Sequence, residues 1–158
     1  MQLINVLIIF FCFNQTFGQV VTGNYVDYFG SRLEIKSDST FKYRWNFDLI
    51  SNWSNGKYSI FQDTIHFNVV SIFDTLKRIG KPDSLLLSID EEPNVIDESF
   101  LINYISSNGQ HSGNLPNKLY FKKNKLYYIN DEGKLMTNKV EGMFGRKKYP
   151  TWYYKADE

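Results

Sequence analysis

Cysteine, histidine and alanine are scarce in this chain of 158 residues. It contains one cysteine, Cys12, and two histidines, His66 and His111. With its only thiol near the N-terminus, the rest of the chain can form no disulfide, no thiol nucleophile and no thiolate metal site. Alanine, the strongest helix former, occurs once, at Ala156. The fold must therefore be stabilised by burial, and a helical fold is disfavoured.

Long apolar runs are also absent, except at the N-terminus. Residues 3–13 are almost entirely apolar, but a helix that spans a bilayer needs about 20 such residues. A small-x-small pattern follows at residues 16–18, as at a signal-peptide cleavage site. We therefore expect residues 1–18 to be a cleaved signal peptide that includes Cys12, and the protein to be exported, periplasmic or extracellular, without a transmembrane span. The alternative is an uncleaved membrane anchor.

Aromatic residues are abundant and point to a β protein. They make up 17% of the chain, and 42% of all residues are hydrophobic, which is enough for one globular core. Aromatic and β-branched side chains favour the pleated, half-buried surface of a sheet. This composition predicts an all-β protein.

Charge is balanced overall but unevenly distributed. The net charge is +1, so no global field indicates nucleic acid as a partner. Up to Glu98 there are eight cationic and twelve acidic residues, a net charge of −4; from Ser99 onward there are ten and five, a net charge of +5. Such asymmetry marks either a partner surface or solvated charges on opposite sides of one barrel.

Short stretches of alternating apolar and polar residues recur between turn signals. In one of them, Phe41, Tyr43 and Trp45 fall on one face of a strand, and Lys42 and Arg44 fall on the other. This spacing predicts one antiparallel up-and-down β-barrel of about 8–10 short strands over residues 19–158. Residues 51–56 are expected to form a loop. The segments with strand-like alternation, from which the barrel strands are drawn, cover residues 20–28, 32–36, 40–49, 57–61, 64–70, 85–89, 100–105, 118–122, 125–130, 134–140 and 151–155.

An ordered set of motifs resembles a known family. The motifs are Gly23-x-Tyr25, Leu33-x-Ile35, Asp38-x-Thr40-Phe41-x-Tyr43, Gly56-x-Tyr58 and Asp63-Thr64-Ile65. Their order is similar to that in the first part of small secreted lipocalin-like proteins of Bacteroidetes, and it covers about residues 23–70. The chain departs from the family at Ser39, where Gly is usual, and at Tyr25 and Tyr58, where Trp is common. The resemblance implies a barrel of eight to ten strands that can hold a small-molecule cavity, and it implies no reaction.

Three aromatic residues are the candidates for ligand binding: Tyr43, Trp45 and Tyr58. The interior of an eight-stranded barrel is only just wide enough for side chains to fill it. The three rings of one strand, Phe41, Tyr43 and Trp45, therefore favour a filled core. Any pocket is then expected near one rim, where Tyr43 or Trp45 can present an edge to a ligand. Further residues are expected to point inward: Leu33, Ile35, Tyr58, Ile60, Ile65 and Phe67.

Catalytic and metal-binding motifs are absent from the sequence. His66 and His111 lie far apart along the chain, each without a ligand-like spacing, and no G-x-S-x-G turn supports a serine nucleophile. The acidic residues of segment 90–98 lack the D-x-D-x-D-G order of a calcium loop, so a solvated loop is favoured over a calcium site. We predict neither an enzyme nor a metal or cofactor.

Two kinds of partner remain open at this point. Two groups of cations, residues 122–125 and 146–148, lie close in the sequence to aromatic residues, namely Tyr120, Phe121, Tyr127 and Tyr149. Basic groups interleaved with aromatic residues can bind single-stranded nucleic acid. In an exported chain an anionic envelope component is the better partner, and no nucleic acid is expected. The function is then either a binding module for a small apolar or amphipathic ligand, or a structural or interaction protein of the bacterial envelope with a filled barrel. An enzyme is the least favoured class.

Overall fold

The computed structural model describes residues 20–105, 109–111, 113, 115–142 and 145–156. The expected signal peptide, residues 1–18 with Cys12, lies outside the described residues. Within them, no helix is long and apolar enough to cross a membrane.

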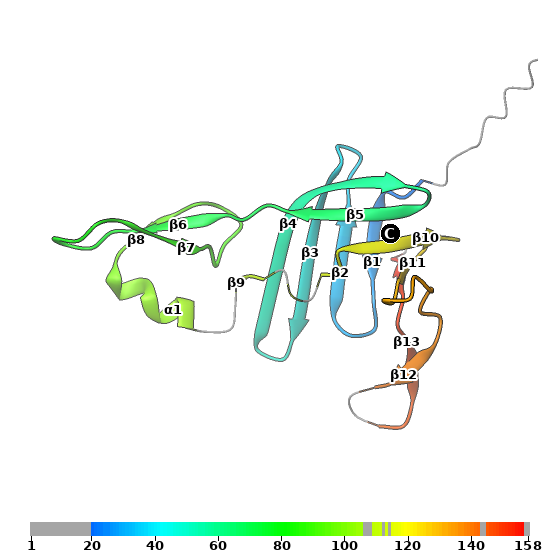
Figure 1. Ribbon diagram of the computed structural model, residues 1–158. Helices are drawn as coiled ribbons and strands as arrows, with labels where there is room; N and C mark the ends of the chain where they lie inside the picture. Colours follow the sequence, from blue (N-terminus) through cyan, green and yellow to red (C-terminus); the bar gives the residue numbers. More distant parts are fainter. Residues whose placement is uncertain (1–19, 106–108, 112, 114, 143–144, 157–158) are drawn as a thin grey trace, which may run out of the picture.

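Eight strands form a closed antiparallel barrel (Figure 1). Their order around the barrel is β3-β2-β1-β14-β11-β10-β5-β4, and pairing of β3 with β4 closes it. Neighbours in space follow chain order, interrupted by two insertions, so the predicted all-β up-and-down barrel is confirmed. The barrel strands are β1 (Gly23–Val26), β2 (Ser31–Ile35), β3 (Thr40–Phe47), β4 (Ile50–Phe61), β5 (Thr64–Val69), β10 (Lys118–Lys122), β11 (Lys125–Tyr128) and β14 (Tyr153–Lys155).

The first insertion joins β5 to β10 and extends away from the barrel (Figure 1). Strands β6 and β7 pair antiparallel, β8 pairs parallel with β6, and we call residues 73–105 the arm. After the arm, β9 adds to the barrel sheet parallel to β4. The elements of this insertion are β6 (Phe73–Leu76), β7 (Ser84–Leu87), β8 (Val95–Ile96), η1 (Glu98–Phe100), α1 (Leu101–Ile105) and β9 (Gly109–Gln110).

The second insertion joins β11 to β14. It contains strands β12 (Lys139–Glu141) and β13 (Lys148–Pro150), which pair antiparallel as a separate two-stranded sheet. In Figure 1 this pair lies beyond the end of the barrel at which the β1–β2 and β3–β4 turns are found. It is therefore placed to cover that end.

The alternation in β3 predicted its two faces correctly. Phe41 and Tyr43 are fully buried and Trp45 partly buried, whereas Lys42 and Arg44 lie on the outer face. The barrel interior is filled mainly by one cluster of buried side chains: Val21, Tyr25, Leu33, Ile35, Phe41, Tyr43, Ile65, Leu115, Leu119, Phe121, Leu126 and Tyr153.

Ile60 differs from its expected inward position. It pairs with Ile65, which is fully buried, yet 48% of Ile60 remains exposed. Ile65 is flanked on its other side by Leu119 of β10, whereas β3 pairs with β4 only over residues 50–57, so no β3 residue lies beside Ile60. The missing neighbour on the β3 side therefore outweighs the alternation.

The expected loop at residues 51–56 is wrong. These residues belong to β4, and each pairs with β3, from Ser51 opposite Asn46 to Gly56 opposite Phe41. The turn-forming residues have other roles here. A Cβ on Gly56 would lie 2.1 Å from the carbonyl oxygen of Asn68, so this glycine permits a close approach of strands rather than a turn.

The expected strand at residues 100–105 is also wrong, because η1 and α1 occupy this segment. The Asp97 side chain accepts a hydrogen bond from the Ser99 backbone amide and caps η1. Among residues 101–104, Leu101 and Tyr104, three residues apart, are partly buried, as on one face of a helix. The Tyr104 hydroxyl donates to Asp74 of β6 and so ties α1 to the sheet of the arm.

Candidate ligand pocket at the end of the barrel

A pocket of about 400 Å³ lies where the β1–β2 and β3–β4 ends of the barrel meet the β12–β13 insertion. Its volume falls within the range of small-molecule sites, about 300–1,000 Å³. Apart from backbone and three glycines, the lining is mainly aromatic, with one cationic side chain. We call this site the mouth pocket; its aromatic and cationic residues are Tyr28, Phe29, Trp45, Phe47, Tyr149 and Lys147.

The β1–β2 turn is shaped to form one wall of the mouth pocket. Asp27 Oδ1 accepts hydrogen bonds from the backbone amides of Phe29 (2.9 Å) and Ser31 (2.8 Å), which fixes the turn. Gly30 has φ +90°, and a Cβ there would lie 2.3 Å from the Asn46 carbonyl oxygen. Only glycine therefore lets this turn approach β3 so closely.

The wall contributed by β3 is held by the same turn. The indole Nε1 of Trp45 donates to the carbonyl oxygen of Phe29 at 3.0 Å, which satisfies its polar group. The rings of Trp45 and Phe47 are stacked, with centroids 6.0 Å apart and an interplanar angle of 24°. Two neighbouring aromatic faces of one strand therefore have a fixed orientation toward the pocket.

The opposite wall comes from the second insertion. Tyr149 of β13 stacks on Tyr28, with ring centroids 3.4 Å apart and an interplanar angle of 15°. Their side-chain hydrogen bond raises the pKa of Tyr28, so its hydroxyl remains neutral at ordinary pH. Lys147 Nζ lies 5.5 Å from the centroid of the Tyr149 ring and is exposed. The pocket thus combines an aromatic lining with one cation at its edge.

Neutral hydroxyl groups occupy the barrel interior on the inward side of Trp45. The Tyr43 hydroxyl lies 3.3 Å from Ser31 Oγ, and the hydroxyls of Tyr128 and Tyr153 are 3.1 Å apart. Burial raises the pKa of Tyr43 to about 12 and raises that of Tyr153 well above its usual range. These groups therefore stay protonated at neutral pH and serve as hydrogen-bonding members of the core.

The structure separates the three residues expected to bind a ligand. Trp45 lines the mouth pocket, as predicted for a pocket near one rim. Tyr43 is completely buried, and Tyr58 lies toward the other end of the barrel, where its hydroxyl donates to the Lys36 carbonyl oxygen at 2.7 Å. A ligand-binding role for all three residues remains a prediction.

Sequence reasoning missed most of the pocket. Tyr28 and Phe29 directly precede Gly30, and an aromatic pair before a turn glycine at the end of a strand is a signal that could have indicated them. Tyr149 and Lys147 come from an insertion far along the chain. No local pattern shows that this insertion folds back onto the β1–β2 turn.

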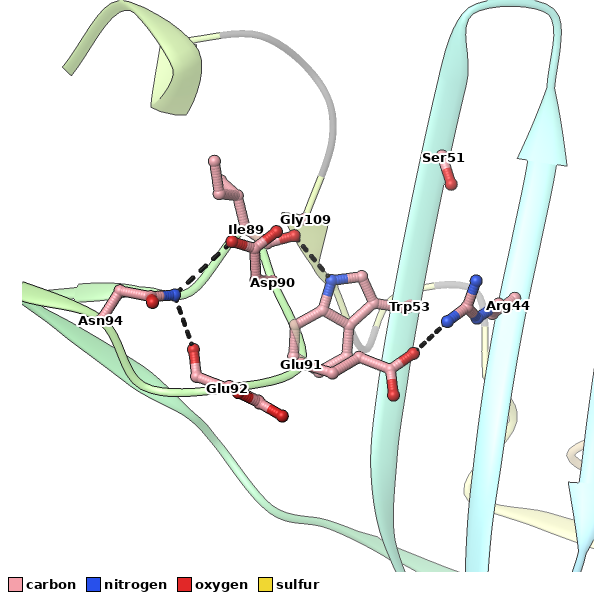
Figure 2. Close-up of a pocket in the computed structure, with 9 residues that line it drawn as sticks. All are labelled: Arg44, Ser51, Trp53, Ile89, Asp90, Glu91, Glu92, Asn94 and Gly109. Atoms are coloured by element: carbon pink, nitrogen blue, oxygen red, sulfur yellow. Dashed lines mark hydrogen bonds and ion pairs between the residues drawn. The ribbon is translucent and has the colours of Figure 1, made fainter. Parts of the chain in front are cut away.

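A second pocket, of about 570 Å³, lies between the arm and strands β3 and β4 (Figure 2). Glu91 reaches from the arm to Arg44 and, at 2.6 Å, to Lys42 Nζ. These hydrogen bonds, opposed by partial burial, lower the pKa of Glu91 to about 2. The Trp53 indole donates to the Ile89 carbonyl oxygen at 3.0 Å. The second pocket is therefore the junction of arm and barrel.

The acidic segment does not assemble into a metal site within the described residues. Asp90 and Glu92 line the second pocket, where the Asn94 side-chain amide donates to the Glu92 carbonyl oxygen at 2.9 Å. Across the described ranges, no group of three or more His, Cys, Asp or Glu side chains could hold an ion. His66 and His111 are both exposed. The structure therefore adds no support to the calcium alternative.

Comparison with known proteins adds no further assignment. No protein-family model matches the chain, and no curated protein or solved structure is significantly similar to it. The interpretation of the mouth pocket therefore depends on its own geometry.

Proposed function

We propose that this protein is an exported, lipocalin-like barrel that binds a small amphipathic ligand in the mouth pocket. The observation that carries the proposal is the aromatic lining of a pocket of about 400 Å³ at one end of a closed barrel. The apolar or aromatic body of the ligand lies against Trp45 and Phe47. An anionic group of the ligand lies beside Lys147.

The chemistry of the walls supports this choice of ligand. Aromatic side chains provide large apolar contact area with few rotatable bonds, so little conformational entropy is lost on binding. The Trp45 indole N–H is already bonded to Phe29, which leaves its ring face for apolar contact. Lys147 is exposed and provides the charge that distinguishes an acid from its neutral analogue.

We further propose that the protein acts without catalysis. The buried tyrosines Tyr25, Tyr43 and Tyr153 have raised pKa values and remain protonated, so they supply no base at neutral pH. Both histidines are exposed and neither lines the mouth pocket. The pocket therefore offers contact surface and one positive charge, and these suit binding.

A second candidate function is a structural or interaction role at the bacterial envelope, with an anionic envelope component as partner. The packing of the interior favours it, because Tyr25, Tyr43 and Tyr153 are fully buried along with the aliphatic core. On this account the mouth pocket binds no small molecule, and the barrel serves as a rigid support for its two insertions.

The test is a titration of the protein with a fatty acid, haem and anilinonaphthalene sulfonate, followed by tryptophan emission. The proposal predicts saturable micromolar binding of at least one member of the panel. Trp45→Ala should weaken that binding about tenfold or more, because a large apolar contact is removed. Trp152→Ala is the matched control, since Trp152 packs on Tyr127 and does not line the pocket.

Lys147→Ala separates the charge from the apolar contact. It should weaken binding of anilinonaphthalene sulfonate while it leaves binding of an uncharged naphthalene unchanged. Circular dichroism of each variant shows whether the barrel is intact. Absence of binding across the panel, or equal loss in Trp45→Ala and Trp152→Ala, would reject the mouth pocket as a ligand site and favour the envelope role.

A further inference from the structure

The sheet of the arm has one bare apolar face. Phe73 of β6 lies opposite Leu87 of β7, and Thr75 of β6 lies between Leu85 of β7 and Val95 of β8. These five side chains are therefore on the same side of the sheet. The apolar members of this face are strongly exposed, with Leu85 at 66% and Val95 at 72%. We call the exposed side chains of Phe73, Leu85, Leu87 and Val95 the apolar face.

The other side of this sheet is covered. Asp74, Leu76 and Ile96 alternate with the residues of the apolar face and are buried. Tyr104 of α1 donates a hydrogen bond to Asp74, and the Asn94 backbone amide donates to the same carboxylate at 2.7 Å. The arm is therefore an ordered, one-sided layer whose apolar face has no cover from the rest of the described chain.

Cations gather at the free end of the arm. The β6–β7 turn, residues 77–83, contains Lys77, Arg78 and Lys81 against one acidic residue, Asp83, which pairs with Lys77 at 2.5 Å; the net charge of the turn is +2. Between them, Ile79 is 104% exposed and projects beyond the end of the sheet. Figure 1 shows this turn as the part of the arm farthest from the barrel.

Anionic side chains lie at the opposite end of β7. Asp90, Glu91 and Glu92 follow that strand where it returns to the barrel, and Glu91 pairs with Lys42 and Arg44. Two further acidic residues, Asp97 and Glu98, follow β8, which runs parallel to β6, so they lie toward the same end of the sheet as Lys77. Asp97 accepts hydrogen bonds from Ser99 at the start of η1. The acidic segment 90–92 therefore lies at the base of the arm, whereas Arg78 and Lys81 flank the exposed Ile79 in the turn at its tip.

We propose that the arm docks on an anionic lipid surface, with Ile79 entering the interface and the apolar face lying against it. Lysine and arginine beside a projecting apolar side chain are the chemistry of interfacial membrane binding, in which both charge attraction and apolar burial contribute. Face-to-face pairing of two arms would cover the apolar face but leave Ile79 and the cations beyond the contact. The lipid surface accounts for both features, and the inference does not rest on the mouth pocket.

The first test is co-sedimentation of the full chain with vesicles. Binding should be stronger to vesicles of phosphatidylglycerol and phosphatidylcholine than to phosphatidylcholine alone, and should fall with added salt. Ile79→Ser and Leu85→Ser should each weaken binding roughly fivefold or more, since each removes an apolar contact. Leu49→Ser is the matched control, because Leu49 is an exposed apolar residue, at 86%, in the β3–β4 turn. All variants share the same N-terminal residues, so differences between them report on the arm.

The second test locates the contact directly. A tryptophan introduced by Ile79→Trp should be quenched by brominated lipid in the anionic vesicles, whereas one introduced by Leu49→Trp should be quenched no more than the unsubstituted protein. Equal effects at positions 79 and 49 in both tests would overturn the proposal. It would also be overturned if the chain associated with itself through Leu85, as seen by analytical ultracentrifugation, without binding the vesicles.

Discussion

At the scale of single residues, inside and outside positions of the barrel follow the alternation of side chains, modified by distance from the rim. Phe41 and Tyr43 lie deep in the interior, and Trp45, two residues further along β3, reaches the pocket at the end of the barrel. The same strand therefore supplies core and site. Whether a ring of β3 belongs to the core or to the pocket therefore depends on how far its residue lies from the end of the barrel, and not on which aromatic residue it is.

Phe41 should be among the costliest positions to truncate. Its ring is 1% exposed and packs edge-on against Phe67, with centroids 4.9 Å apart. Phe41→Ala should lower the free energy of unfolding by about 3–5 kcal/mol, whereas Lys57→Ala on an exposed position of β4 should change it by less than about 0.5 kcal/mol. Urea denaturation followed by circular dichroism measures both. Similar small losses would show that the barrel interior is not packed around Phe41.

Gly56 supplies a second residue-scale prediction. A Cβ there would meet the Asn68 carbonyl oxygen at 2.1 Å and the Phe41 ring at 3.0 Å. Gly56→Ala must therefore shift β4 from β5 and should cost about 1–3 kcal/mol of stability. A thermal denaturation midpoint unchanged from that of the parent protein would be inconsistent with this close approach.

At the scale of elements, alternation and turn residues predicted most of the barrel strands, and they failed where tertiary contacts decide. The hairpins around residues 62–63 and 123–124 were evident because apolar alternation flanks short polar turns on both sides. Segment 51–56 is rich in turn formers but is held as strand by pairing with β3. Segment 100–105 has strand-like composition but is helical, since Asp74 and Asp97 provide partners that no local pattern specifies.

The junction between arm and barrel should be sensitive to acid. Hydrogen bonds from Lys42 and Arg44 lower the pKa of Glu91 from 4.5 to about 2, so its charged form is favoured by folding. The resulting stabilisation is present above pH 4.5 and is lost as the pH falls from 4.5 toward 2, when the carboxylate becomes protonated. The protection factors of the amides of residues 88–92, which are the intrinsic hydrogen-exchange rates at each pH divided by the observed rates, should therefore fall across this interval.

Glu91→Gln tests the assignment of that acid sensitivity. In this variant the protection factors of residues 88–92 should already be low at pH 6, and they should show no further fall below pH 4.5. The matched control is Glu132→Gln, because Glu132 forms an exposed pair with Lys134 at 2.8 Å far from the arm. An acid response that persists in Glu91→Gln would assign it to another carboxylate.

At the scale of the whole molecule, the class of fold was predictable, whereas the site was only partly so. Strand number and the absence of helical periodicity favoured a closed barrel, and Trp45 was expected near a rim. The stack of Tyr28 on Tyr149 joins a turn near the N-terminus to an insertion near the C-terminus. Likewise, closure of the barrel depends on pairing of β1 with β14. Such contacts depend on three-dimensional packing, which a single sequence does not display.

The central claim is that ligand binds at the Trp45 end of the barrel. Calorimetric titration of anilinonaphthalene sulfonate into the parent protein, Phe47→Ala and Phe61→Ala tests it most directly. Phe47 lines the mouth pocket, whereas Phe61 lies exposed beside the β4–β5 turn toward the other end of the barrel. The account predicts one micromolar site, weakened about tenfold or more by Phe47→Ala and unchanged by Phe61→Ala. No heat of binding in the parent protein, or equal weakening by both substitutions, would contradict it.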